Sequence, residues 1–193
     1  MSIYDNIIAV TDRHLCARPL PEQAERICRL HPQGIILREK DLPEREYEML
    51  ARAVISSCAG YGVPLTLHYY PETALKLGVK RIHLPLHELE DLDRTVLDQF
   101  EVIGTSVHSA ADALRAQSLG ASYLTAGHIF ATDCKKGLPA RGLDFLAGVC
   151  RTVSIPVYAI GGIGRDEDRI KAVMECGAAG ACVMSGMMEE IIF

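Results

Sequence analysis

Two cations separated by one residue could bind a phosphate or a carboxylate group. Arg38 and Lys40 flank Glu39 at the end of an apolar run, and alternation along an extended chain places both cations on the same side. A guanidinium beside an ammonium suits anions of this kind. The alternative is a surface salt bridge with Asp12 or Asp41, and both arrangements can hold at once.

Small residues follow two other apolar runs, closer to the C-terminal end of the sequence. Gly161 and Gly162 follow one run, and Ser185 and Gly186 follow the next. Glycines at such places let backbone N–H groups approach an anion, and a short helix beginning at Gly186 would add the attraction of its dipole. A tight turn is the alternative explanation of the glycine pair. We favour phosphate binding by these four residues.

The longest segment without a helical pattern, residues 127–142, has the length of a lid or a binding loop. His128 lies near its beginning, and an imidazole exchanges protons near neutral pH. A lone histidine is more often structural, so the residues alone leave both interpretations open. Thr132, Lys135 and Lys136 could close over a phosphate or over a ring.

Eight short apolar runs would position these side chains. The runs are Ile7–Thr11, Gly34–Arg38, Pro64–His68, Arg81–Leu84, Val102–Ser106, Ser122–Ala126, Pro156–Ile160 and Gly180–Met184. Most are continuously apolar, which is typical of strands buried on both faces of a parallel sheet. Dividing the length by eight gives about 24 residues a unit, enough for a strand and a crossover helix.

Helical patterns separate several of the runs, at Pro43–Ala59, Ser109–Leu119, Leu143–Val153 and Asp166–Cys176. Alternating strands and helices predict an α/β fold, a (β/α)₈ TIM barrel rather than an open doubly wound sheet. We expect a single domain over residues 1–193, a minimal barrel whose final helix is truncated. The active site of such a barrel lies at the carboxyl ends of its strands.

Composition excludes several classes of function. A net charge of −5 argues against a nucleic-acid partner, although local groups can still bind a phosphorylated ligand. The sequence contains no apolar run long enough to span a bilayer and no signal-peptide pattern at its start. The seven cysteines form no CxxC pair and are interpreted as reduced thiols. We therefore expect a cytoplasmic protein with no membrane partner.

Four segments, in order along the chain, resemble the thiamine phosphate synthase superfamily. They are residues 36–40 (Ile-Leu-Arg-Glu-Lys), residues 103–109 (Ile-Gly-Thr-Ser-Val-His-Ser), the loop from residue 127, and residues 155–163 (Ile-Pro-Val-Tyr-Ala-Ile-Gly-Gly-Ile). The resemblance implies a TIM barrel, a homodimer, and thiazole or pyrimidine phosphates as small-molecule substrates in thiamine biosynthesis. It also implies that Ser106 contacts the ligand, and it leaves His108 ambiguous.

The family has two branches that use different chemistry. Synthases join hydroxymethylpyrimidine diphosphate to thiazole phosphate and require magnesium, whereas TenI-type thiazole tautomerases aromatise a carboxythiazole phosphate without a metal. Synthases have Asn-Asp after strand three and Gly-Gln-x-Asp after strand four, with both acids binding magnesium. This sequence instead has His68-Tyr69 and Pro85-Leu86-His87-Glu88. One displaced carboxylate is a poor magnesium site, so we expect no metal or other cofactor unless the chain is a synthase.

The long loop resembles the tautomerase version of the family motif. It contains Gly127-His128-Ile129-Phe130 and then residues 132–137 (Thr-Asp-Cys-Lys-Lys-Gly), in which the resemblance makes His128 the acid–base residue. His68 is a second catalytic candidate, while Arg38, Lys40, Ser106, Thr132 and Lys135 would bind the substrate. These features favour a thiazole tautomerase, an isomerase with a thiazole phosphate substrate. The alternatives are a thiamine phosphate synthase, which is a transferase, or a non-catalytic thiazole-phosphate-binding regulator.

Overall fold

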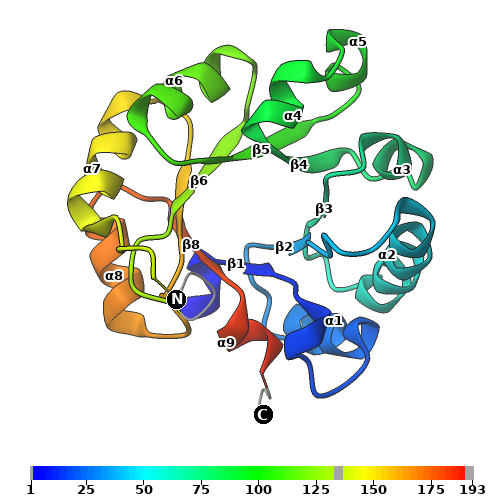
Figure 1. Cartoon of the computed structure of the whole chain (residues 1–193). Helices are drawn as coiled ribbons and strands as arrows, with labels where there is room; N and C mark the ends of the chain where they lie inside the picture. Colours follow the sequence, from blue (N-terminus) through cyan, green and yellow to red (C-terminus); the bar gives the residue numbers. More distant parts are fainter. Residues whose placement is uncertain (1, 133–136, 190–193) are drawn as a thin grey trace.

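Eight parallel strands close into a barrel in the computed structural model, which describes residues 2–132 and 137–189 (Figure 1). The strands are β1 (Ile7–Val10), β2 (Gly34–Leu37), β3 (Leu65–His68), β4 (Arg81–Pro85), β5 (Val102–Val107), β6 (Tyr123–Gly127), β7 (Val157–Ile160) and β8 (Gly180–Val183). Each strand pairs with the next one, and β8 pairs with β1. The predicted TIM barrel is confirmed, with every strand boundary within one residue of its expected place.

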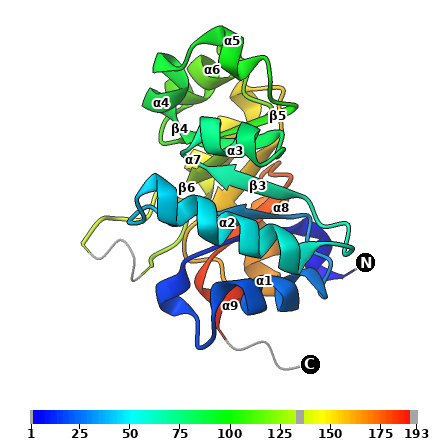
Figure 2. The same cartoon turned by 90° about the vertical axis from the view of Figure 1, so that its right-hand side faces the viewer.

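Helices surround the barrel on its outer side (Figures 1 and 2). They are α1 (Leu20–Cys28), α2 (Glu44–Cys58), α3 (Pro71–Lys76), α4 (Leu86–Asp91), α5 (Arg94–Leu97), α6 (Ala110–Ser118), α7 (Gly142–Thr152), α8 (Glu167–Glu175) and α9 (Ser185–Met188), with short 3₁₀ helices at Ile3–Asn6 and Arg13–Leu15. The four expected helices are α2, α6, α7 and α8. The sequence reading missed α1, and it missed α3 to α5 because four to six residues are too few to show a period.

The strands bury both of their faces, as their continuous apolar runs require. Residues facing outward, such as Ile7, Ile35 and Leu37, join the large core between the strands and the helices. Residues facing inward form a smaller apolar core inside the barrel, consisting of Ile8, Val10, Ile36, Tyr123, Tyr158 and Cys182. Side chains keep alternating between the two faces up to the carboxyl ends of the strands, where the inward-facing ones include polar residues.

The last described helix, α9, begins at Ser185, one residue before its expected start. Gln23 of α1 holds this segment, because its buried amide donates hydrogen bonds to the carbonyl oxygens of Met187 at 2.7 Å and Glu189 at 3.2 Å. Among the described residues, no helix is long and apolar enough to cross a membrane.

Gly104 in β5 is required by the ring of Tyr123 on the neighbouring strand. A Cβ atom at this position would overlap the Tyr123 ring. We expect Gly104→Ala to lower the free energy of unfolding by about 1–3 kcal/mol, as overpacking does, when measured by urea denaturation. The control is Gly148→Ala in α7, where nothing lies within 4 Å and alanine favours the helix. Equal stability of the two variants would contradict this account.

Candidate active site

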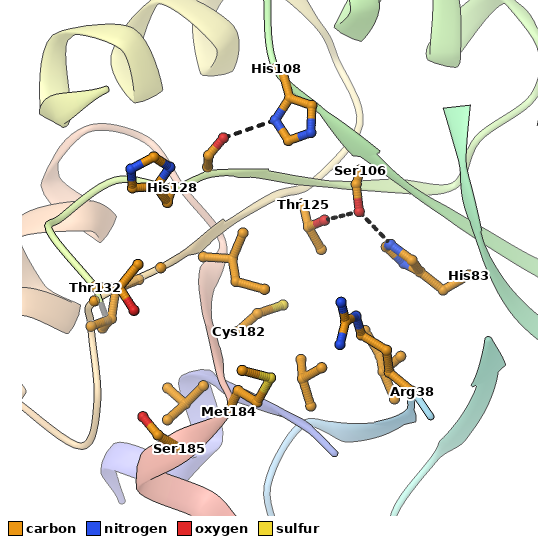
Figure 3. A pocket seen from close by; sticks show the side chains of 18 of the residues that line it. Arg38, His83, Ser106, His108, Thr125, His128, Thr132, Cys182, Met184 and Ser185 are labelled. Atoms are coloured by element: carbon orange, nitrogen blue, oxygen red, sulfur yellow. Dashed lines mark hydrogen bonds between the residues drawn. The ribbon is translucent and has the colours of Figure 1, made fainter. Parts of the chain in front are cut away.

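A cavity of about 1240 Å³ opens at the carboxyl ends of the strands (Figure 3). The predicted site residues that line it are Arg38, Lys40, His68, Ser106, His128, Thr132, Gly161, Gly162 and Ser185. Gly186 is buried and packs beside Gly164 and Arg165 instead of lining the cavity. Lys135 lies outside the described residues. Most of the residues that the sequence predicted for the site therefore line the cavity, while the role of each residue remains a proposal.

A hydrogen-bond network fixes the backbone that carries Arg38 and Lys40. The Thr11 hydroxyl donates to the buried Glu39 carboxylate at 2.7 Å and accepts from the Arg38 backbone N–H at 2.9 Å. Arg13 donates to Glu39 through its backbone N–H and its guanidinium, the latter at 3.1 Å. Glu39 thus points away from the cavity, and alternation leaves its two neighbours to line it.

The alternative partner that the sequence suggested for the two cations, Asp41, is engaged by other groups. Arg13 Nη2 lies 2.5 Å from the Asp41 carboxylate, and His14 Nε2 lies 3.0 Å from it. The guanidinium of Arg13 holds the pKa of the Asp41 carboxyl below its usual range. In Figure 3 the Arg38 guanidinium points into the cavity, toward the side where His83 lies.

Glu39 should be needed for stability, because its side chain is 1% exposed and accepts hydrogen bonds from three donors, one of them shared between its two oxygens. In Glu39→Gln the new amide N–H₂ must face N–H or O–H donors of Arg13 or Thr11. Arg13 also loses the negative charge with which it pairs. We expect a loss of about 1–3 kcal/mol in the free energy of unfolding, measured by urea denaturation. Glu101→Gln, at an exposed position, is the matched control. An undiminished stability of Glu39→Gln would show that the network contributes little.

A chain of polar side chains crosses the floor of the cavity. The Tyr123 hydroxyl is hydrogen-bonded to His83 Nδ1 at 3.0 Å, and His83 Nε2 is hydrogen-bonded to the Ser106 hydroxyl at 2.9 Å. The Thr125 hydroxyl donates to Ser106 at 3.0 Å (Figure 3). His83 is buried inside the barrel, and it orients the serine that the family resemblance singled out.

Two imidazole rings in this region stay neutral at physiological pH. His68 stacks on His83 with ring centroids 5.8 Å apart and planes at 18°. Burial, followed by the positive charges of Arg38 and Lys40, lowers the pKa of His83 to about 3. Burial, His83 and the same two cations lower the pKa of His68 to about 2. His68 can therefore orient a ligand by hydrogen bonding, while both nitrogens of His83 are engaged by Tyr123 and Ser106. Neither ring carries a proton to donate as an imidazolium near neutral pH.

The glycine pair after β7 packs directly against the loop after β6. A Cβ on Gly161 would overlap the Cβ of His128, and one on Gly162 would overlap the carbonyl oxygen of Ala131. Both glycines also have positive φ angles, 101° and 68°. The tight-turn explanation is thus correct for these residues. It is compatible with phosphate binding, because both residues also line the cavity.

His128 is half-buried at the edge of the cavity. Its Nε2 lies 3.3 Å from the carbonyl oxygen of Leu138, and its own carbonyl accepts the Arg141 backbone N–H at 3.0 Å. His108, which the sequence left ambiguous, also lines the cavity, and its Nδ1 lies 3.0 Å from the carbonyl oxygen of Gly127. Both histidines thus help to fix the loop after β6.

Arg169 is a lining residue that sequence reasoning missed. It lies in the first turn of α8, where its guanidinium donates to the carbonyl oxygen of Gly162 and lies 5.3 Å from the Phe130 ring centroid. Its Nε is 3.4 Å from the Asp166 carboxylate. Its place in the sequence could have identified Arg169, because it is a cation in the first turn of the helix that follows the glycine pair.

Comparison with known protein families assigns the chain. The sequence profile described as thiamine monophosphate synthase matches residues 7–187, which include all eight strands. The chain belongs to this family. Membership of the thiamine monophosphate synthase family connects the chain to thiamine biosynthesis.

Individual members of the thiamine monophosphate synthase family match over nearly their full length. The thiamine-phosphate synthase of Syntrophomonas wolfei subsp. wolfei is 33% identical over 186 residues, which cover 95% of this chain and 88% of that protein. The thiamine-phosphate synthase of Clostridium botulinum is 32% identical over 193 residues, covering 98% and 93%. The structure of thiamine phosphate pyrophosphorylase from Pyrococcus furiosus matches with a TM-score of 0.81 and 29% identity, covering 97% and 89%.

These comparisons correct the predicted activity. The prediction of a thiazole tautomerase, an isomerase, is wrong. Relatives that are 31% to 33% identical over nearly the whole chain are named thiamine-phosphate synthase, which favours the transferase that the sequence analysis kept as an alternative. The prediction gave one histidine in one loop, His128, more weight than the similarity along the rest of the barrel.

Proposed function

We propose that this protein is a thiamine-phosphate synthase, a transferase that joins hydroxymethylpyrimidine diphosphate to thiazole phosphate. The observation that carries the proposal is the near full-length similarity to proteins of that name. The cavity supports it. At about 1240 Å³ it exceeds the roughly 300–1,000 Å³ typical of pockets for one drug-sized ligand, which is consistent with a site for two substrates.

The transfer requires charge neutralisation and positioning. A ring nitrogen of the thiazole forms a bond to the methylene carbon of the pyrimidine, while the bond from that carbon to the diphosphate oxygen breaks. Both electrons of the broken bond leave with the diphosphate, and no proton is removed from carbon. In this proposal Arg38 and Lys40 face the diphosphate, because fixed cations stabilise charge that develops on a leaving group.

The other walls of the cavity would hold the second substrate. The backbone at Gly161 and Gly162, together with Ser185, would bind the thiazole phosphate. Ser185 lies across the cavity from Arg38 in Figure 3. Ser106, oriented by His83, would hydrogen-bond a ring edge. Holding both substrates in one orientation converts a two-molecule reaction into one within a single complex, which can lower the barrier by several kcal/mol.

Magnesium, which the family resemblance implies for a synthase, does not fit the residues at its expected positions. Those positions hold Tyr69, after β3, and Glu88, in α4. Magnesium prefers several oxygen ligands in near-octahedral geometry. Among residues 2–132 and 137–189, no group of three or more histidine, cysteine or acidic side chains is arranged to hold a metal ion.

Simultaneous binding of two ligands tests the proposal. We expect thiazole phosphate to bind in the presence of saturating inorganic diphosphate, the leaving group, with its Kd changed by less than tenfold in isothermal titration calorimetry. A site for one phosphorylated ligand would instead show competition, with the apparent Kd rising in proportion to the diphosphate concentration. Competition of that kind would contradict a two-substrate transferase.

A further inference from the structure

The two positions at which the family resemblance implies magnesium ligands hold a phenol, Tyr69, and a carboxylate, Glu88. The Glu88 carboxylate raises the pKa of the Tyr69 phenol, so the phenol stays protonated. His87 Nε2 lies 3.5 Å from the same carboxylate. Only one of the two positions therefore offers a charged oxygen, and an imidazole lies beside it.

The donors at this position differ in kind from those that magnesium takes. A phenol that stays protonated is neutral, and it presents a hydrogen to its partner instead of a charged oxygen. The neighbouring His68 offers imidazole nitrogen, whereas magnesium prefers oxygen. His68 is also stacked between Tyr69 and His83, with centroids 6.3 Å and 5.8 Å away, so its ring has a fixed place.

Two cationic side chains line the same cavity on its β2 side. They are Arg38 and Lys40, and their positive charges help to lower the pKa values of His68 and His83. Two cationic side chains carry the same formal charge as one divalent cation. Thr11 holds both the Arg38 backbone N–H and the buried Glu39 carboxylate, so the chain between the two cations is anchored at the edge of the cavity.

We propose that this chain binds the phosphate groups of its substrates without a divalent cation, with Arg38 and Lys40 supplying the positive charge and the neutral Tyr69 replacing an expected magnesium-binding carboxylate. The inference rests on the proposed transfer function for the identity of the anions. It concerns only how their charge is neutralised.

Binding of inorganic diphosphate, measured by isothermal titration calorimetry, is the first test. One titration contains excess EDTA, and the other contains magnesium chloride in both solutions. We expect diphosphate to bind in EDTA, with magnesium tightening the Kd by less than tenfold. Absence of binding in EDTA, or a tightening by tenfold or more with magnesium, would overturn the inference. Arg38→Gln should weaken binding in EDTA, whereas Arg52→Gln, on an exposed face of α2, should leave it unchanged.

Restoring a carboxylate at residue 69 is the second test, with Mn²⁺ as a paramagnetic substitute for magnesium. Tyr69 has a φ of 75°, a conformation that aspartate tolerates, and its side chain is 40% exposed, so Tyr69→Asp should fold. With diphosphate present, Tyr69→Asp should remove more Mn²⁺ from the free electron paramagnetic resonance signal than the wild type does. Tyr69→Phe, which removes the hydroxyl without adding a charge, is the matched control. Equal Mn²⁺ binding by the wild type and Tyr69→Asp would overturn the inference.

Product formation separates this inference from the proposed function. Thiamine phosphate that forms only with added magnesium would overturn the inference and support the function. Tight binding of diphosphate in EDTA without any product, in EDTA or in magnesium, would support the inference and overturn the function. Product formed equally in both solutions would support both.

Discussion

Replacing Arg38 with glutamine should reduce the rate of thiamine phosphate formation by about 100-fold or more, the effect of removing one fixed group that stabilises developing charge. Arg38 is the cation seen pointing into the cavity, and its backbone N–H is fixed by Thr11. The loss should appear in kcat, because the charge on the leaving diphosphate grows as the bond breaks. Steady-state kinetics with both substrates would measure it.

Two further variants separate lost charge from lost structure. Arg38→Lys retains the charge without the planar guanidinium and should recover part of the rate. Arg52→Gln removes an exposed guanidinium that pairs with Glu48 in α2, and it should have the wild-type rate. A rate for Arg38→Gln within threefold of the wild type would contradict the role given to this residue.

Acidification from pH 7 to pH 5 should destabilise the fold through His68 and His83. Their pKa values in the folded state are about 2 and about 3, well below the roughly 6.5 of an unfolded histidine. Below pH 6.5 the unfolded chain therefore binds protons that the folded chain excludes, so stability falls as the pH falls. At pH 5 each ring should cost about 2 kcal/mol of unfolding free energy.

Urea denaturation at the two pH values would measure this effect, and variants would assign it. His83→Gln should remove about half of the pH dependence, since glutamine can keep a hydrogen bond to Ser106. His31→Asn, at an exposed turn with a φ of 50°, should leave the pH dependence unchanged. An unchanged pH dependence in His83→Gln would contradict a buried neutral imidazole at this position.

The sequence predicted the barrel accurately because its strands are buried on both faces. Continuous apolar runs such as Ile7–Thr11 are recognisable without a partner, and their number indicated closure. The helix α1 was missed, although its buried face includes Ala24 and Ile27, because prolines at positions 19 and 21 interrupt the pattern where the helix begins. Local patterns therefore located the strands better than the short or proline-initiated helices.

Alternation also predicted which side chains enter the cavity but not what holds them there. Arg38 and Lys40 were expected to share a side, and both line the cavity. The partner of Glu39 is Arg13, 26 residues earlier in the chain, and no local pattern connects the two. The effect of Glu88, in α4, on the phenol of Tyr69, after β3, similarly depends on the pairing of β3 with β4, which no local pattern specifies.

The prediction of activity failed for a related reason. His128 and its loop resemble one branch of the family, and acid–base chemistry followed from a single imidazole. The structure gives that imidazole a contact with the Leu138 carbonyl at 3.3 Å and places cations and glycines around a cavity of about 1240 Å³. Activity depends on all the residues that line the site. Similarity along the entire chain includes more of these residues than one motif does.

The most direct test of the account is incubation of the purified protein with hydroxymethylpyrimidine diphosphate and thiazole phosphate, in magnesium and in EDTA, with both products quantified. The account predicts thiamine phosphate and inorganic diphosphate in equal amounts, at a rate that Arg38→Gln lowers about 100-fold. Failure to form thiamine phosphate in either solution, by a protein that still binds thiazole phosphate, would contradict the proposed transfer and leave a binding protein in its place.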